Sequence, residues 1–222
     1  MKTVELPKSG RMASNGAAEL NVTIGAPNIE TIVLKLRGAS PYVCARFSQK
    51  VQNILKERHE AGSTSKSKKA KEARDFTADY EGSMYIAEKG WAGIPAGAFR
   101  TAAISACRLV GYKMTLAKLS VFVVADGFDK FSGTPLVKIE GTPEMNISPV
   151  RNATGVLDLR ARAMWREWSV NLKMRYDADQ FKASDVVNLI ARVGQQVGIG
   201  EGRHDSRESC GCGWGTFTIE NT

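Results

Sequence analysis

Residues 29–37 read IETIVLKLR, and this stretch decides the fold because it has the two-residue period of a β-strand. One face of the strand is apolar and carries Ile32, Leu34 and Leu36. The other face carries Val33, Lys35 and Arg37. The sequence therefore predicts a strand that packs one side against a core.

Five further elements follow this strand along the chain. They are a helix over 95–110, strands over 119–125 and 165–176, a helix over 184–195 and a strand over 216–220. The first helix is rich in alanine, and WREWSVNLKMRY at 165–176 alternates like the opening strand. The order is βαββαβ, the split pattern of ferredoxin-like and RRM-type folds. We therefore expect an α+β protein with one RRM-like domain over residues 1–222.

Two insertions interrupt this pattern. The first spans residues 39–90 and contains a predicted helix over 42–59 and a basic loop over 60–75. The second spans residues 126–164, where short β-like pieces between Gly, Pro and Asn predict an inserted β-hairpin before the third strand.

Composition limits the classes of function. The 222 residues carry 31 basic and 23 acidic side chains, a net charge of +8, which favours a polyanionic partner. No apolar run approaches the roughly 20 residues of a membrane span. The first residues contain no apolar stretch, so we expect no secretion signal, no membrane partner and a cytoplasmic location. The four cysteines do not form the pattern of a disulfide scaffold.

A glycine-rich segment near the C-terminus is the densest motif. Seven of the 21 glycines fall within residues 194–215. Glycine allows close backbone approach, and arginines and aromatics are interspersed, as suits contact with a phosphodiester chain. The candidate residues are Gly198, Gly200, Gly202, Arg203, His204, Arg207 and Gly213. The alternative is a flexible loop that leads into an edge strand.

Basic side chains elsewhere are further candidates for phosphate contacts. In the basic loop they are Lys66, Lys68, Lys69, Lys71 and Arg74. On and after the alanine-rich helix they are Arg100, Arg108 and Lys113. Trp165 is a candidate for stacking on a base, with Arg166 beside it. The alternatives are a solvated linker, a charged surface and a core tryptophan.

The position of the glycine-rich loop, between the second helix and the last strand of a βαββαβ unit, resembles that of the glycine-rich loop in the RAMP superfamily of CRISPR effector proteins. The segment GIPAGAFRTAAISACR is similar to the "IPGSSLKGALR"-like opening of the first long helix in that family, with matches at Ile94, Pro95, Gly97, Phe99 and Arg100. The sequence departs from the family at Ala96 and Ala98, and CGCGWG is unusual. The two insertions resemble those of the backbone subunits, whose hairpin acts as a thumb. Small phage-encoded proteins show a similar arrangement, which implies a viral origin and a bacterial or phage-infected host cell.

The resemblance implies binding of RNA or another single strand and repetition along it. We therefore expect a protein that binds single-stranded nucleic acid, RNA favoured, without sequence specificity. We also expect it to assemble head to tail along the strand, with other effector subunits as further partners. One alternative is a viral structural protein that oligomerises without nucleic acid. The other is a metal-independent endoribonuclease that uses His204 with Asp205 for general acid–base chemistry.

Neither catalysis nor a cofactor is expected from the sequence. The two histidines, His59 and His204, lie in no nucleophile or carboxylate motif. Cys210 and Cys212 form C-x-C with His204 six residues earlier, whereas structural zinc usually takes C-x₂₋₄-C spacing. We therefore assign no catalytic residue, metal or cofactor, and treat buried or idle thiols as the default.

Overall fold

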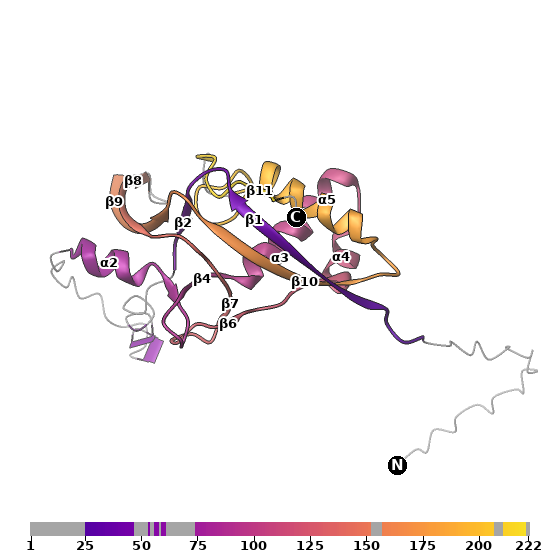
Figure 1. Ribbon diagram of the computed structural model, residues 1–222. Helices are drawn as coiled ribbons and strands as arrows, with labels where there is room; N and C mark the ends of the chain where they lie inside the picture. The colour runs from indigo at the N-terminus through magenta and orange to yellow at the C-terminus, as the bar shows by residue number, and fades with distance from the viewer. Residues whose placement is uncertain are drawn as a thin grey trace, which may run out of the picture.

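The protein is described by a computed structural model that covers residues 25–46, 53, 56, 57, 59, 60, 74–151, 157–206 and 211–220. The described chain is a mixed α+β structure with antiparallel sheets, which confirms the α+β part of the predicted fold class (Figure 1). Of the predicted contacts, Lys66, Lys68, Lys69, Lys71 and Arg207 lie outside the described residues, as does Cys210.

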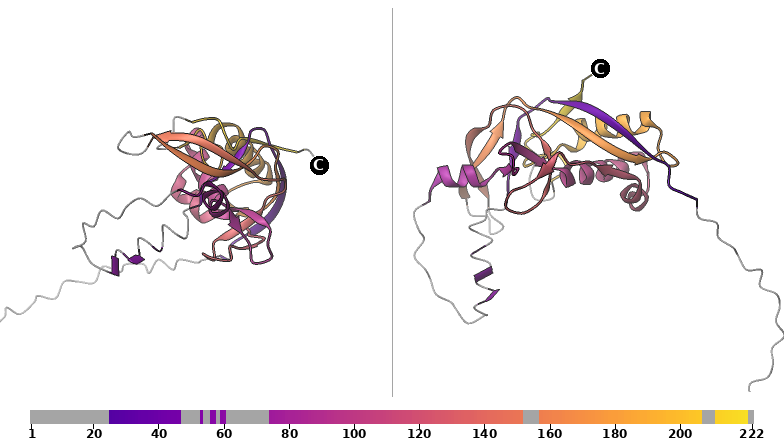
Figure 2. Two further views of the ribbon diagram at one scale, coloured as in Figure 1. Left: turned by 90° about the vertical axis from the view of Figure 1, so that its left-hand side faces the viewer. Right: turned by 60° about the horizontal axis from the view of Figure 1, so that its bottom comes forward.

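The main sheet has four antiparallel strands in the order β11-β1-β10-β5. Strand β1 (Ile29–Gly38) pairs along its length with β10 (Ser169–Asp177), and the two ribbons run side by side in Figure 2. The edges are the short strands β11 (Phe217–Ile219), beside β1, and β5 (Val121–Val123), beside β10.

The inner face of the main sheet forms the core. As the alternation predicted, Leu34 and Leu36 of β1 are buried, together with Val170, Leu172, Met174 and Tyr176 of β10. Helix α3 (Ala96–Ala106) and helix α5 (Ala183–Arg192) contribute to the same core. Ala102, Ala103 and Ala106 are almost inaccessible, since small side chains let a helix lie close to its neighbours.

Short helical segments continue these helices. A 3₁₀ turn, η1 (Cys107–Val110), follows α3, and helix α4 (Met114–Ser120) leads directly into β5. A π-helical turn, η2 (Val193–Val197), follows α5 and ends at Gly198, which has a positive φ of 73°. Gly194, within this turn, leaves no room for a Cβ, which would lie 2.1 Å from the carbonyl oxygen of Phe217.

Two smaller sheets are built mainly from the segments predicted as insertions, and one of them also includes Ala92–Pro95, which lies between the first of those segments and the first predicted helix. One has the order β2-β9-β8, with β2 (Tyr42–Cys44), β9 (Leu157–Trp165) and β8 (Glu144–Arg151). The other has the order β3-β4-β7-β6, with β3 (Tyr85–Ile86), β4 (Ala92–Pro95), β7 (Pro135–Lys138) and β6 (Gly127–Phe128). Helix α2 (Phe76–Gly82) packs against β9 and begins at Asp75, whose carboxylate accepts from the N–H groups of Thr77 and Ala78.

Two of the predicted elements differ from the structure in part. The helix expected over 42–59 is instead strand β2 at its start, where Tyr42, Val43 and Cys44 are all buried, whereas the described residues 53, 56, 57 and 59 are helical. The strand expected over 165–176 is split, because β9 ends at Trp165 and β10 begins at Ser169. The rings of Trp165 and Trp168 both pack on Tyr42, with centroids 5.7 and 5.9 Å away, and the chain turns between them.

Candidate nucleic-acid interface

A groove of about 1290 Å³ lies between four parts of the chain. One wall is the start of α3, and another is the loop of residues 198–206, which we call the glycine loop. The hairpin of β8 and β9 supplies a third wall, and β2 supplies residues at the base. Cys212 and Trp214 also line this central groove.

The glycine loop is held in place by its backbone. The N–H of Glu201 donates to the carbonyl oxygen of Val43 at 3.0 Å, and the N–H of Ile199 donates to that of Gly215 at 3.0 Å. Gly198, Gly200 and Gly202 have φ values of 73°, 77° and 70°, which side chains rarely adopt. The glycines therefore serve close packing as well as any approach of a ligand.

Two arginines of β9 face the loop across the groove. Arg160 and Arg162 are two residues apart on the strand, so their side chains share a face. Arg162 is only 8% exposed and forms an ion pair with the carboxylate of Glu201 in the glycine loop. Burial lowers the pKa of Arg162, and the charge of Glu201 partly opposes that shift. This pair joins the hairpin to the glycine loop.

The positive charge of the groove is partly neutralised. Arg203 belongs to the glycine loop, and its Nη1 donates to the carbonyl oxygen of Gly200 at 2.9 Å. Glu201 and Asp205 are the acidic residues among the groove lining, against Arg160, Arg162 and Arg203. The lining therefore keeps one positive charge in excess.

The far end of the glycine loop is fastened to α3 and η1. The Nη2 of Arg108 lies 2.7 Å from Oδ2 of Asp205, and the hydroxyl of Ser105 donates to the same carboxylate. The hydrogen bond from Ser105 lowers the pKa of Asp205, burial opposes this effect, and Arg108 lowers it further. Arg108, predicted as a phosphate contact, is thus engaged in holding the loop.

Replacing Asp205 by alanine is expected to loosen the glycine loop. Since the pair is partly exposed, it contributes no more than about 1 kcal/mol, so amide exchange at Ile199 and Glu201 should accelerate by up to roughly fivefold. Because the folded pKa is lowered, the contribution is present above about pH 3.9 and is lost as pH falls through the folded value. Hydrogen exchange measured by mass spectrometry tests this, with Asp158→Ala on the hairpin as control. Equal exchange in both variants would contradict it.

The structure brings some predicted contacts together and separates others. Gly198, Gly200, Gly202 and Arg203 line the central groove, and exposed His204 lies beside it with Gly213 nearby. Lys113 is exposed at the start of α4. Arg74 is paired with Asp79 and Asp158 at 2.7 and 2.8 Å, and Arg166 is paired with Glu144.

Arg100 supports the main chain. Its Nε donates to the carbonyl oxygen of Val121 at 3.0 Å, and its Nη2 donates to that of Lys118. The guanidinium also lies 5.5 Å from the centre of the Phe122 ring. Arg100 therefore joins α3 to the end of α4 and the start of β5.

The prediction that Trp165 stacks on a base is wrong. Its side chain is 1% exposed, at the end of β9 and against Tyr42. Burial of the whole ring leaves no face for a nucleotide. The tryptophan that does line the groove is Trp214, in the turn before β11.

Sequence reasoning missed Arg160, Arg162 and Glu201, and it considered Asp205 only as a partner of His204 in RNA cleavage. The signal for the two arginines was present in LDLRARAMW, residues 157–165, where alternation places them on one face of a strand. The carboxylates gave no such signal, because their partners are distant in the sequence.

Comparison with protein-family models and with curated proteins gives no match to this chain. Among the described residues, no helix combines the length and the apolar character needed to cross a membrane.

Proposed function

We propose that the chain binds single-stranded nucleic acid in the central groove, RNA in preference to DNA, without reading its sequence. The observation that carries the proposal is an open groove with the glycine loop on one wall and Arg160 on another, where Arg162 joins the two walls through Glu201. Arginine guanidinium groups bind phosphates through paired N–H donors. The preference for RNA rests on the resemblance to the RAMP superfamily.

The start of α3 gives the strand room. Gly97 and Thr101 are exposed in the groove, and Ala98 lies beside them. A Cβ at Gly97 would meet no atom within 4 Å, so packing does not require glycine there. Glycine in a helix costs about 1 kcal/mol relative to alanine. The need for space in the groove explains why glycine, rather than alanine, stands at position 97.

The arrangement of the main sheet supports an RRM-type core within this proposal. The order β11-β1-β10-β5 is antiparallel throughout, with α3 between β1 and β5 and α5 between β10 and β11 in the sequence. We propose on this basis the ferredoxin-like βαββαβ arrangement, with the β8–β9 hairpin as a thumb-like insertion.

Head-to-tail assembly along the strand is part of the same proposal. One face of the β8–β9 hairpin exposes a set of apolar side chains, namely Met145, Ile147, Leu157 and Leu159. Such a patch is typical of protein–protein contacts. A non-closing contact between copies would give a filament, and titration with strands of increasing length reports the number of copies bound.

Replacing Gly97 by leucine is expected to abolish strand binding in the groove while keeping the fold. The added side chain has space at its Cβ and a better helix propensity by about 0.8 kcal/mol, but it projects into the groove. Fluorescence anisotropy with a labelled oligouridylate at rising salt measures the affinity. For the unmodified protein, log K should fall linearly with log salt, by about 0.7 for each phosphate contacted.

The matched control is Gly25→Leu. Gly25 is exposed and lies outside the groove lining, and a Cβ added there would likewise meet no atom within 4 Å. This variant should bind like the unmodified protein. If Gly97→Leu binds as well as Gly25→Leu, the groove is not the binding site.

A further inference from the structure

The outer face of the main sheet carries a second set of cations, away from the core. Lys35 and Arg37 project from β1, and Lys173 and Arg175 project from β10. All four are exposed, and no acidic residue occupies an outward position between Thr31 and Arg37 or between Ser169 and Arg175. This face is distinct from the central groove, whose lining includes none of these residues.

The register places the four cations in one oblique row. Lys35 is paired with Asn171, and Lys173 is paired with Val33, so the two lysines are diagonal neighbours about 7–8 Å apart. Arg37 and Arg175 extend the row by two residues at each end, which is about 6.7 Å each. The row therefore spans roughly 21 Å in single file.

The two ends of the row differ in their partners. Glu220, next to β11, lies 2.7 Å from Nζ of Lys35 and 3.7 Å from Nη1 of Arg37. It holds those two side chains over the sheet. Lys173 and Arg175 have no side-chain hydrogen bond or ion pair among the described residues. Two uncompensated cations therefore face solvent at the centre of the sheet.

The other side chains on this face limit the kind of partner. RRM-type sheets read bases with aromatic rings at the centre of the sheet. Here those positions hold Val33 and Lys173, and Phe122 on the edge strand is covered by Arg100. Val33 is 60% exposed, a single apolar side chain that would give a lipid surface little to anchor. The central positions of the face therefore offer contacts to a row of negative charges rather than stacking surfaces for bases.

We propose that this row, Arg37, Lys35, Lys173 and Arg175, binds successive phosphates of a single nucleic-acid strand as a second, sequence-independent contact surface. The choice of nucleic acid as the polyanion rests on the proposed function, whereas the site is separate from the groove. A single file of cations matches a chain of regularly spaced charges better than it matches a point anion.

The test is the double variant Lys173→Gln/Arg175→Gln, compared with Lys89→Gln/Lys138→Gln. The control removes the same charge from exposed positions outside the main sheet. Binding of a labelled oligouridylate is measured by anisotropy at several salt concentrations, with circular dichroism to verify folding. The double variant Lys173→Gln/Arg175→Gln, called the face variant below, should bind about tenfold more weakly. Its slope of log K against log salt should be smaller by about 1.4, since each phosphate on a single strand contributes about 0.7. The control should keep the original slope.

The outcomes separate this proposal from the groove. If the face variant keeps the slope of its control while Gly97→Leu loses binding, the face proposal is overturned and the groove stands. If the face variant loses slope while Gly97→Leu binds normally, the face proposal is supported and the groove proposal fails. Binding to phosphatidylserine vesicles but to no oligouridylate, lost in the face variant, would make the partner a lipid surface and overturn the proposal.

Discussion

Replacing Arg46 by alanine is expected to lower the free energy of unfolding by about 3–5 kcal/mol, because it leaves a buried carboxylate without its counter-charge. The Nη2 of Arg46 lies 2.8 Å from Oδ2 of Asp129. The side chains are only 5% and 0% exposed. Chemical denaturation, followed by fluorescence, measures the change.

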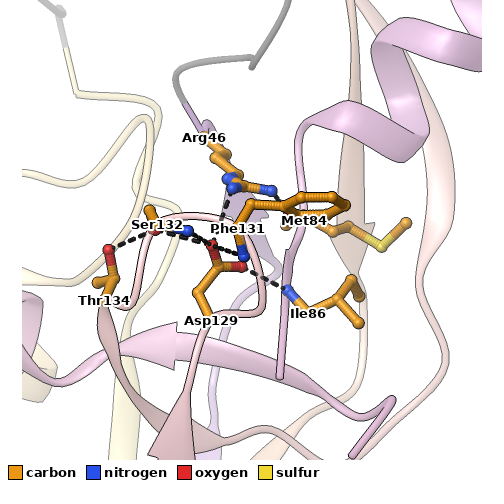
Figure 3. A network of polar contacts seen from close by, with 7 residues as sticks. All are labelled: Arg46, Met84, Ile86, Asp129, Phe131, Ser132 and Thr134. Carbon is orange, nitrogen blue, oxygen red and sulfur yellow. Dashed lines mark hydrogen bonds and ion pairs between the residues drawn. The ribbon is translucent and has the colours of Figure 1, made fainter. Parts of the chain in front are cut away.

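The surroundings of Asp129 explain why this loss is large. Figure 3 shows its carboxylate at the centre of a network with Arg46, Ile86, Phe131 and Ser132. Three backbone N–H groups and the hydroxyl of Ser132 donate to it. These donors position the carboxylate for a cation, and the guanidinium of Arg46 also lies 5.0 Å from the Phe131 ring centre. Removing Arg46 removes both contacts.

The same network predicts a dependence on pH. Burial alone would raise the pKa of Asp129, but hydrogen bonds from Ser132 and the charge of Arg46 outweigh it and lower the pKa. A lowered folded pKa means that the stabilisation is complete above about pH 3.9 and is lost as pH falls through the folded value. Arg46→Ala should lose less stability on acidification than the unmodified protein.

Arg74→Ala is the matched control for Arg46→Ala. Arg74 likewise forms ion pairs, in its case with Asp79 and Asp158 at 2.7 and 2.8 Å, but its side chain is 40% exposed. Exposed pairs contribute about 0–1 kcal/mol, so this variant should remain close to the unmodified protein. If both variants lose the same small amount of stability, burial does not control the strength of the Arg46 pair.

Replacing Gly200 by alanine is expected to cost about 2–5 kcal/mol of stability and to abolish strand binding in the groove. Its φ of 77° is unfavourable for any side chain. In addition, a Cβ would lie 2.6 Å from the Tyr42 ring and 2.7 Å from the carbonyl oxygen of Val43. Because Tyr42 is fully packed against Trp165 and Trp168, the loop has to move away from β2.

The variant Gly213→Ala separates the cost of the unfavourable φ from the cost of the steric clash. Gly213 has a similar φ of 75°, but the nearest atom to its Cβ would be Cε1 of His204, at 3.5 Å. This variant therefore carries the backbone strain without the clash, and should lose about 1–3 kcal/mol. Denaturation and oligouridylate anisotropy are measured for both. Equal losses in the two variants would show that packing on Tyr42 does not fix the loop.

The sequence predicted the central part of the fold because that part has a local period. Alternation in residues 29–37 gave the inner and outer faces of β1, and the spacing of Phe99, Ala102, Ala103 and Ala106 gave the buried face of α3. Each pattern depends only on side chains that are neighbours along the chain. The glycine-rich segment 194–215, which contains the glycine loop, was likewise visible as a concentration of one residue type.

The sequence did not predict elements that are buried on every side. All three residues of β2 are inaccessible, so the segment has no alternation, and the apolar residues after it suggested a helix. Trp165 continued the alternation of the following strand in the sequence, yet the chain turns between Trp165 and Ser169. The shared contact of Trp165 and Trp168 with Tyr42, more than 120 residues earlier, decides that turn.

The candidate sites divide in the same way. The sequence by itself determined the surplus of positive charge, the glycine loop and which residues of β1 and β10 face outward. Only the tertiary structure paired Arg162 with Glu201 and Arg108 with Asp205, and only the register of β1 on β10 aligned four cations into one row. The physical reason is that a period along the chain fixes the direction of a side chain, whereas its partner is fixed by packing between segments that are distant in the sequence.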